Sequence, residues 1–311
     1  MKGLASFVMR GPSQAVMVTS ILALLSLVLP LFGMLSAASV GLVALRQGAR
    51  SGFTISLLAT LACGVFLVGY DWLTPTGIGS PLLALGFLML QWLPVLLLGL
   101  FLRSSRSLGQ AIQLALGFGL LIILAQYLLL GSPAEYWQTQ LQLLIEQFEK
   151  AGVLDQANNE AVLQQMAGWM GGVLAAAVFL QLVFSLLLAR WWQALLYNPG
   201  GFRIEFHQFR LHKLLGLIGL PGLVILLLPF QEIPEIVRYL VTLLFAVLFL
   251  QGLAVVHGIL GKAGSGLPWL VGLYLLLIIL LPQALMVLAT VGLLDIWIDF
   301  RTRFERSRSP G

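Results

Sequence analysis

Two carboxylates near the end of the chain have the type and spacing of an acid–base pair. Asp295 and Asp299 are four positions apart, so a helix would present both side chains on one face, one turn apart. Paired carboxylates serve as general acid and general base in many enzymes. However, Arg301 and Arg303 follow closely, and local ion pairing with these arginines is the stronger interpretation.

Other signatures of catalysis or metal binding are missing from the sequence. His207 and His212 have no third ligand beside them, whereas catalytic zinc sites use three protein ligands and structural ones four. No H-E-x-x-H or G-x-S-x-G segment occurs, and Gly261-Lys262 is followed by Ala263, where a phosphate-binding P-loop needs Ser or Thr. We therefore expect no enzyme, no catalytic residue, no metal site and no bound cofactor.

Glutamines interrupt several long apolar runs of the chain. Each could line a polar cavity, or could hydrogen-bond a neighbouring helix, a contact that contributes about 0.6 kcal/mol on average inside a membrane. The sequence leaves both interpretations open, with helix contact favoured for any single glutamine. The candidates for lining a cavity are Gln91, Gln126, Gln181 and Gln251.

The composition identifies the environment in which these residues must act. The chain is 59% hydrophobic and only 9% charged, whereas about 25% of an ordinary globular protein is charged. A soluble fold could not cover its surface with so few charges, and the mean hydropathy is +0.99. The sequence therefore predicts an all-α, polytopic membrane protein whose main partner is the lipid bilayer. The net charge of +5 is attributed to membrane topology and not to nucleic acid.

Eight apolar runs are long enough to supply membrane-spanning helices, since about 20 residues cross a bilayer core once. The runs 14–45 and 267–294 are too long for one pass, and each contains a proline, Pro30 or Pro282, that favours a break. We therefore expect eight to ten spans, with ten favoured. The other runs are 52–70, 81–102, 108–130, 167–189, 213–230 and 239–260.

The distribution of positive charge predicts the orientation. All but two of the 17 Lys and Arg residues fit on one side of the membrane, and the exceptions are Lys150 and Arg238. Lys and Arg collect on the cytoplasmic side, so both termini are expected there. This pattern favours a multi-pass protein whose basic side faces the cytoplasm.

The longest polar stretch, 131–166, is expected on the outer side. Trp137, Leu141, Leu144 and Phe148 recur at helical spacing, and Gln and Glu fill the opposite face. An amphipathic helix lying on the membrane surface is the favoured interpretation. The functional alternative is a cap over an outward-facing pocket.

Two segments on the cytoplasmic side combine turn chemistry with aromatic and charged residues. The loop 190–212 holds a strong turn signal followed by an aromatic and a charged face, typical of an interfacial helix or of a platform for a protein partner. A helix then emerges before the basic tail 295–311, which anionic lipid would attract. The candidate docking residues are Asn198, Pro199, Gly200, Gly201, Phe202, Arg203, Glu205 and Phe206, and the candidate interfacial motif is Asp295, Trp297, Asp299 and Arg301.

At these two segments the sequence resembles the YybS-like family of bacterial integral membrane proteins, whose function is unknown. The likeness rests on 198–202 with Glu205 and Phe206, and on the terminal motif from Gly292 to Arg301. That family is distantly similar to the substrate-binding S components of energy-coupling-factor transporters. The resemblance implies a multi-pass protein of the bacterial cytoplasmic membrane. It also implies an N-terminal unit, 1–189, whose stretch 14–189 forms an S-component-like bundle, and an additional set of helices within 213–294.

The resemblance, the glutamines and the two cytoplasmic segments lead to two functional expectations. The first is a transport-related protein that binds a small neutral or lipid-like solute within the bundle, with movement driven by a partner ATPase module or by rocking of the helices. The second is a membrane scaffold that recruits cytoplasmic proteins through 190–212 and the tail.

Overall fold

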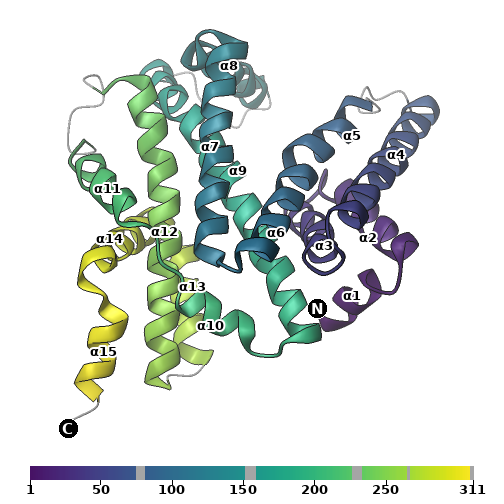
Figure 1. The fold of residues 1–311 in the computed structure, drawn as a ribbon. Helices are drawn as coiled ribbons and strands as arrows, with labels where there is room; N and C mark the ends of the chain where they lie inside the picture. Colours follow the sequence, from purple (N-terminus) through teal and green to yellow (C-terminus); the bar gives the residue numbers. More distant parts are fainter. Residues whose placement is uncertain (75–80, 151–158, 226–232, 265–266, 309–311) are drawn as a thin grey trace. The chain divides into compact units, whose positions relative to one another are not determined.

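The computed structural model describes the backbone of the 311 residues except 75–80, 151–158, 226–232, 265–266 and 309–311. Every regular element in the described part of the chain is a helix, as predicted (Figure 1). The chain divides into two compact units. Unit 1 comprises Met1–Ala115 and Leu180–Phe206, and unit 2 comprises Leu116–Phe179 and His207–Gly311.

Two long helices contribute residues to both units. Helix α7 (Leu108–Leu130) passes into unit 2 after Ala115, and α9 (Asn159–Tyr197) enters unit 1 at Leu180. The other helices of unit 1 are α1 (Lys2–Val8), α2 (Pro12–Leu25), α3 (Leu31–Gln47), α4 (Ala49–Leu73), α5 (Pro81–Phe87), the π-helical segment η1 (Leu88–Trp92), α6 (Leu93–Ser105) and α10 (Gly201–His207). Those of unit 2 are α8 (Pro133–Lys150), α11 (Lys213–Ile225), α12 (Glu235–Ala263), α13 (Leu267–Ile279), α14 (Leu281–Ile298) and α15 (Phe300–Arg308).

Both long apolar runs break at their prolines, as the sequence predicts. Pro30 immediately precedes α3, five residues after the end of α2, and Pro282 lies in the first turn of α14. Proline lacks the backbone N–H that a continuing helix would need, so it is tolerated at a helix start and not in the interior. Each run therefore folds as two helices.

The helices are those of a multi-pass membrane protein. By length and apolar composition, six described helical stretches could each cross a membrane, and four shorter apolar helices accompany them. The six are Ala49–Leu73, Leu82–Ser105, Leu108–Leu130, Leu163–Tyr197, Glu235–Ala263 and Leu281–Ile298. The shorter ones are Pro12–Leu25, Leu31–Gln47, Lys213–Gly222 and Pro268–Ile279.

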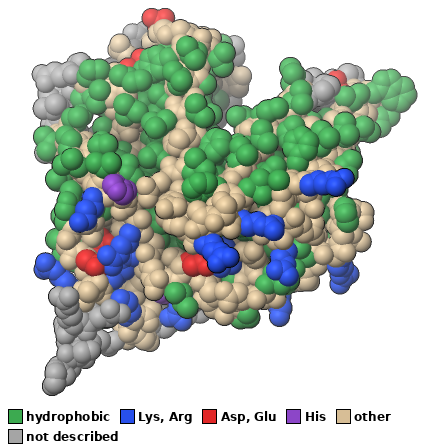
Figure 2. Space-filling view, in the orientation of Figure 1, with side chains coloured by type: hydrophobic (Ala, Val, Ile, Leu, Met, Phe, Trp, Pro, Cys, Tyr) green, Lys and Arg blue, Asp and Glu red, His purple; other side chains and the backbone are tan. Residues whose placement is uncertain are grey.

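The surface has the character that lipid contact requires. Large apolar side chains are exposed, for example Trp72 at 84% and Leu129 at 82%, whereas soluble proteins rarely expose wide apolar patches. In Figure 2, the hydrophobic side chains on the visible face of each unit are largely separate from its Lys and Arg side chains, which gather toward one end of that unit. Each unit therefore has an apolar body and a basic end.

Close helix crossings hold each unit together. In unit 2, α12 and α14 touch at two glycines, because a Cβ on Gly252 would lie 1.8 Å from the Leu288 carbonyl oxygen and one on Gly292 would lie 2.1 Å from that of Leu248. In unit 1, the indole Nε1 of buried Trp92 donates to Ser36 Oγ at 3.0 Å. The glycines at 216, 219 and 222 on α11 also contact α12 or α14 side chains.

Candidate functional site

Two of the four predicted glutamines make hydrogen bonds between helices of unit 2. The Gln126 Nε2 of α7 donates to the Gly171 carbonyl of α9 at 3.1 Å, and its Oε1 accepts from Trp137 Nε1 of α8 at 3.0 Å. Gln251 of α12 donates to Asp295 at 2.8 Å, and its Oε1 accepts the backbone N–H of Leu211 at 3.1 Å. Helix contact, the favoured interpretation, describes both side chains.

The other two glutamines meet in unit 1. A Cβ built on Gly33 of α3 would lie 3.2 Å from Gln91 Oε1 and 3.4 Å from Gln181 Nε2, so the two carboxamides converge on this glycine. The Oε1 atom of Gln91 is buried and has no hydrogen-bond partner among the described residues. Gly33, Gln91 and Gln181 are called the glutamine cluster below.

The glutamine cluster lies far along the helices from the basic end of unit 1. Gly33 precedes Arg46 by 13 residues, and Gln91 precedes Arg103 by 12. At 1.5 Å per residue these separations are roughly 18–20 Å. Because a bilayer core is about 30 Å thick, the cluster is close to mid-depth if the arginines stand at the membrane surface.

The backbone around the glutamine cluster is irregular. Gln91 belongs to the π-helical segment η1, and Gly33 follows the break between α2 and α3 at 26–30. Isolated π-helical turns occur frequently at functional sites. Broken helices at membrane depth are tolerated where the backbone is buried in protein or lines a cavity, and transporters use them to bind their substrates.

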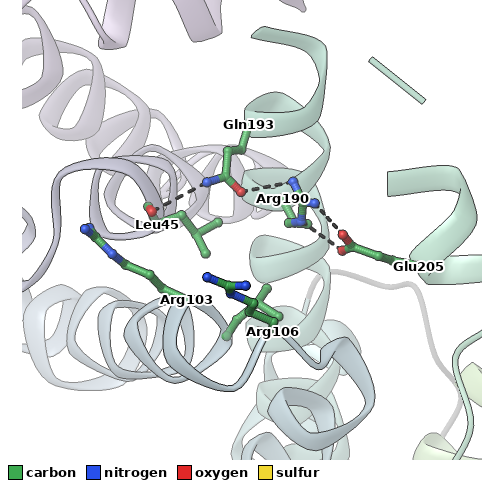
Figure 3. Close-up of a pocket in the computed structure, with 7 residues that line it drawn as sticks. Leu45, Arg103, Arg106, Arg190, Gln193 and Glu205 are labelled. Atoms are coloured by element: carbon green, nitrogen blue, oxygen red, sulfur yellow. Dashed lines mark hydrogen bonds and ion pairs between the residues drawn. The ribbon is translucent and has the colours of Figure 1, made fainter. Parts of the chain in front are cut away.

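A second candidate is a cavity of about 250 Å³ at the basic end of unit 1 (Figure 3). Arg190 of α9 forms a two-pronged ion pair with Glu205 of α10, in which Nε donates to Oε2 at 2.8 Å and Nη2 contacts Oε1. Its Nη1 donates to Gln193 Oε1 at 3.0 Å. We call this cavity the arginine pocket; it is lined by Leu45, Leu102, Arg103, Arg106, Arg190, Gln193 and Glu205.

Arg103 and Arg106 reach the arginine pocket from the end of α6 and the turn that follows. Both side chains are exposed, and Arg103 Nη1 approaches the Ala44 carbonyl at 3.5 Å. Arg106 has a left-handed backbone with φ of 54°, and its N–H donates to the Leu102 carbonyl at 2.9 Å. Ser107 Oγ then accepts the Gln110 N–H at 3.4 Å, so the chain turns sharply into α7.

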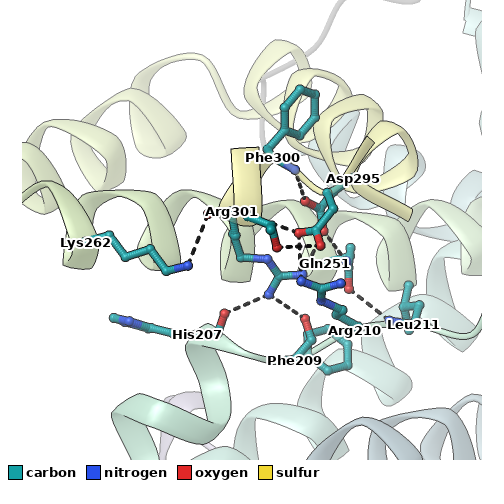
Figure 4. Close-up of polar contacts among 11 residues, drawn as sticks. His207, Phe209, Arg210, Leu211, Gln251, Lys262, Asp295, Phe300 and Arg301 are labelled. Atoms are coloured by element: carbon teal, nitrogen blue, oxygen red, sulfur yellow. Dashed lines mark hydrogen bonds and ion pairs between the residues drawn. The ribbon is translucent and has the colours of Figure 1, made fainter. Parts of the chain in front are cut away.

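Unit 2 contains a buried polar network at its own basic end (Figure 4). Arg301 and Asp295 form an ion pair at 2.7 Å, as predicted for these residues, with side chains only 2% and 1% exposed. Arg301 also donates to the carbonyls of His207 at 2.7 Å and Phe209 at 2.8 Å, and its own carbonyl accepts from Lys262 at 3.1 Å. We call these contacts the Arg301 network; they connect the 207–211 segment to α12 and α14.

Asp299 forms its ion pair with Arg210, and not with the neighbouring Arg301 or Arg303 that the sequence suggests. Its Oδ1 accepts from Arg210 Nη2 at 2.7 Å, and its Oδ2 accepts from the Thr302 hydroxyl at 2.6 Å. Burial by itself would raise the pKa of Asp299, but the donors of Thr302 and Arg210 outweigh it and lower the pKa below its ordinary value. This carboxylate is therefore a capping and pairing group, held in its charged form.

The predicted docking loop is partly occupied by contacts within the protein. Phe206 is buried and stacks with half-buried Phe202 at 5.8 Å between ring centroids, and Glu205 is paired with Arg190. Gly200 adopts a φ of +88°, which suits the turn predicted at 198–201. The surface that this loop exposes includes Asn198, Pro199, Gly200, Arg203 and Ile204.

The predicted interfacial motif separates into buried and exposed members. Trp297 is 45% exposed, which suits a tryptophan at the edge of a membrane. Asp295 and Arg301 are instead buried in the Arg301 network. Arg301 therefore anchors the chain internally, whereas Arg303 of the same tail is exposed.

In the sequence, Arg103 and Arg106 indicate only which side of the membrane is cytoplasmic. The sequence does not predict that they share a pocket with Arg190 and Glu205. Arg103 and Arg106 are about 85 to 100 positions before Arg190 and Glu205 in the chain, so no local motif predicts the pocket. A weak signal was present, because two arginines three positions apart followed by Ser107 form a positively charged turn between two apolar runs.

Comparison with known proteins identifies the family. A search of curated proteins and a search of solved structures each find no match. The profile of a family described as predicted membrane proteins, DUF2232, matches residues 17–296. That range covers all or most of each apolar helix and contains the glutamine cluster and the arginine pocket. The chain therefore belongs to the DUF2232 family of membrane proteins.

Proposed function

We propose that this protein is transport-related and binds a small neutral or lipid-like solute at the glutamine cluster of unit 1. The observation that carries the proposal is the convergence of the Gln91 and Gln181 carboxamides on Gly33, with Gln91 Oε1 buried and without a partner in the described part of the chain. The protein would bind and move this solute without chemical change, and so would act without catalytic residues or a cofactor.

An unsatisfied buried acceptor supports ligand binding because it is costly. Leaving such a group without a hydrogen bond costs about 1–3 kcal/mol, whereas a solute hydroxyl or amide would satisfy it. Gly33 supplies the space beside the two carboxamides, since any side chain there would crowd them. The break before α3 and the π-helical segment η1 support the same position, because irregular backbone at membrane depth accompanies binding sites in transporters.

The charge pattern supports a solute without net charge. The segments 31–45, 82–102 and 170–189, which surround the glutamine cluster, contain no Asp, Glu, Lys or Arg. An ion in these surroundings would remain without a counter-charge, which is expensive inside a membrane. A neutral polar solute, or a lipid-like one with a polar group, fits two carboxamides in an apolar bundle.

For the topology we propose ten crossings with both termini in the cytoplasm of a bacterial cell, in its cytoplasmic membrane. Support comes from the ten apolar helices and from the breaks at Pro30 and Pro282. The basic ends of the two units support the orientation, because Lys and Arg favour the cytoplasmic side.

The resemblance to YybS-like proteins extends the proposal to energy coupling. If the bundle within 14–189 works as S components do, an ATPase module would act as a partner that powers the movement. The amphipathic helix α8 of unit 2 would then lie on the outer surface of the membrane. Its Trp137 donates a hydrogen bond to Gln126 of α7.

The test is solute-dependent stabilisation of the purified protein in nanodiscs. Across a broad panel of neutral and lipid-like compounds, we expect at least one to raise the melting temperature. Gln91→Leu and Gly33→Leu should abolish that rise, while Gln47→Leu, an exposed glutamine at the end of α3, should preserve it. A panel without any stabilising compound, or a rise that survives both cluster substitutions, would overturn the proposal.

A scaffold function is the second candidate, favoured by the exposed Ile204, which is 59% accessible beside exposed Arg203. Affinity purification from native membranes should then recover a cytoplasmic protein. The double variant Ile204→Ser with Arg203→Ser should no longer retain that protein. Recovery of an ATPase pair that is insensitive to both substitutions would favour the transport function instead.

A further inference from the structure

We infer that the arginine pocket of unit 1 binds the phosphate group of an anionic ligand, a phosphate monoester or diester. This site is separate from the glutamine cluster, and the inference does not depend on the proposed transport function. Four features of the pocket carry it: its size, its excess of guanidinium groups, the backbone at Arg106 and its position at the end of the helices.

The pocket has the size of a headgroup. Its volume of about 250 Å³ is below the roughly 300–1,000 Å³ typical of pockets for drug-sized ligands. Leu45 and Leu102 are buried and supply an apolar wall, while the arginines supply the polar one. Such a lining suits a phosphate with a short organic substituent.

The charges in the pocket are unequal. Three guanidinium groups line it and one carboxylate, that of Glu205, opposes them. Glu205 and Gln193 occupy all three nitrogens of the Arg190 guanidinium, so Arg190 is held in place and its charge is offset. Arg103 and Arg106 therefore contribute two positive charges beyond those that the pocket neutralises. Guanidinium groups bind phosphate oxygens through paired hydrogen bonds, and this geometry distinguishes arginine from lysine.

The backbone of Arg106 has a conformation that glycine adopts more easily than arginine. A left-handed conformation costs about 1–2 kcal/mol for a residue with a side chain, and glycine or asparagine normally occupies it. Strain of this kind collects at functional sites, and a phosphate-binding role would account for an arginine in this turn. Here the strained turn directs the Arg106 side chain along the wall of the pocket (Figure 3).

The position of the pocket matches the level of lipid phosphates. It lies at the end of α3 and α6, where the apolar segments give way to Arg46, Arg50, Arg103 and Arg106. Basic pockets between membrane helices bind anionic headgroups in this way. The same chemistry would accept a soluble phosphate ester from the cytoplasm, and the experiment separates these two sources.

The experiment compares wild-type protein in nanodiscs of phosphatidylcholine alone with nanodiscs that also contain phosphatidylglycerol. Inorganic phosphate and glycerol 3-phosphate are titrated separately into the phosphatidylcholine nanodiscs. The readouts are the melting temperature and the lipids retained in native mass spectrometry. The variants are Arg106→Gly and Arg103→Gln, with Arg50→Gln as the matched control, an exposed arginine at the same end that does not line the pocket.

We expect wild-type protein to retain and be stabilised by the phosphate-bearing ligand. Each pocket substitution should weaken binding about tenfold or more, the value of one charge-assisted hydrogen bond, while Arg50→Gln should change it less than about twofold. A response to phosphatidylglycerol identifies a lipid headgroup as the source. A response to glycerol 3-phosphate or phosphate in phosphatidylcholine identifies a soluble ligand. Both outcomes support the inference.

The choice of Arg106→Gly keeps the test interpretable, because glycine favours the left-handed turn and should leave the fold intact. The melting temperature in phosphatidylcholine alone should therefore not fall. The inference is overturned if no phosphate-bearing ligand has an effect, or if Arg50→Gln weakens binding as much as the pocket variants do. Gln91→Leu, which removes the proposed solute site, should leave phosphate binding unchanged, so the two proposals fail separately.

Discussion

The guanidinium of Arg301 and the carboxylate of Asp295 lie 2.7 Å apart, and both side chains are almost fully buried in unit 2. The pair is part of a larger set of contacts, because Asp295 also accepts from Gln251 and Arg301 also donates to two backbone carbonyls of the 207–211 segment. Burial lowers the pKa of Arg301 and the Asp295 carboxylate opposes that shift. The pair is therefore an internal anchor. It connects α12 and α14 to the segment that precedes α11.

Removing one member of this pair should destabilise unit 2 strongly. Asp295→Asn or Arg301→Met leaves the other charge buried without its counter-ion, which costs about 3–5 kcal/mol. The double variant should lose less than the sum of the two single losses, because no unpaired charge remains. Denaturant unfolding in detergent measures the free energies of unfolding, and Arg303→Met, at an exposed arginine, is the control. Additive losses would contradict a direct coupling of the two residues.

Acid should weaken the Asp299 contacts. The folded pKa of Asp299 lies below its ordinary value of about 3.9, so its stabilisation is fully present above that pH and disappears as the pH falls through the folded pKa. The effect should stay below about 1 kcal/mol, because Arg210 is 51% exposed and solvent screens the pair. We expect melting temperatures below pH 4 to fall more steeply for wild type than for Asp299→Asn. Parallel pH profiles would contradict this role of Asp299.

The crossing of α12 and α14 should tolerate no side chain at its glycines. A Cβ on Gly252 or Gly292 would lie 1.8 Å or 2.1 Å from a backbone oxygen of the facing helix, so the helices would have to separate. Gly252→Ala and Gly292→Ala should each cost about 3 kcal/mol or more. Gly272→Ala on α13, where nothing lies within 4 Å, should change stability by less than about 1 kcal/mol. Thermal unfolding of the three variants provides the comparison, and equal stabilities would contradict the close crossing.

Neutralising Glu205 should strengthen phosphate binding in the arginine pocket. Glu205 is the carboxylate that offsets Arg190, and Glu205→Gln would free the guanidinium for an anion while preserving the size of the side chain. We expect a several-fold higher affinity for glycerol 3-phosphate or phosphatidylglycerol in the nanodisc assay. A variant that keeps its melting temperature but binds more weakly would contradict the role assigned to Glu205, and Arg203→Gln, at an exposed position of the same loop, is the control.

The sequence by itself determined the features that depend on local chemistry. Its composition specifies an all-helical membrane protein, and Pro30 and Pro282 specify where two long apolar runs break. The αL turn around Gly200 and the pairing of Asp295 with Arg301 also follow from residues close together in the chain. Each of these features is a consequence of backbone geometry, of transfer from water to lipid or of charges a few residues apart, and so it could be predicted.

The tertiary structure alone decided which distant residues meet. Gln91 and Gln181 were equal candidates to Gln126 and Gln251, yet the first two converge on Gly33 while the last two join helices of unit 2. The helices are apolar on nearly all faces, so periodicity does not mark which face turns toward a neighbour. Small residues and individual polar contacts select the pairs instead, and these act only once the helices are packed together.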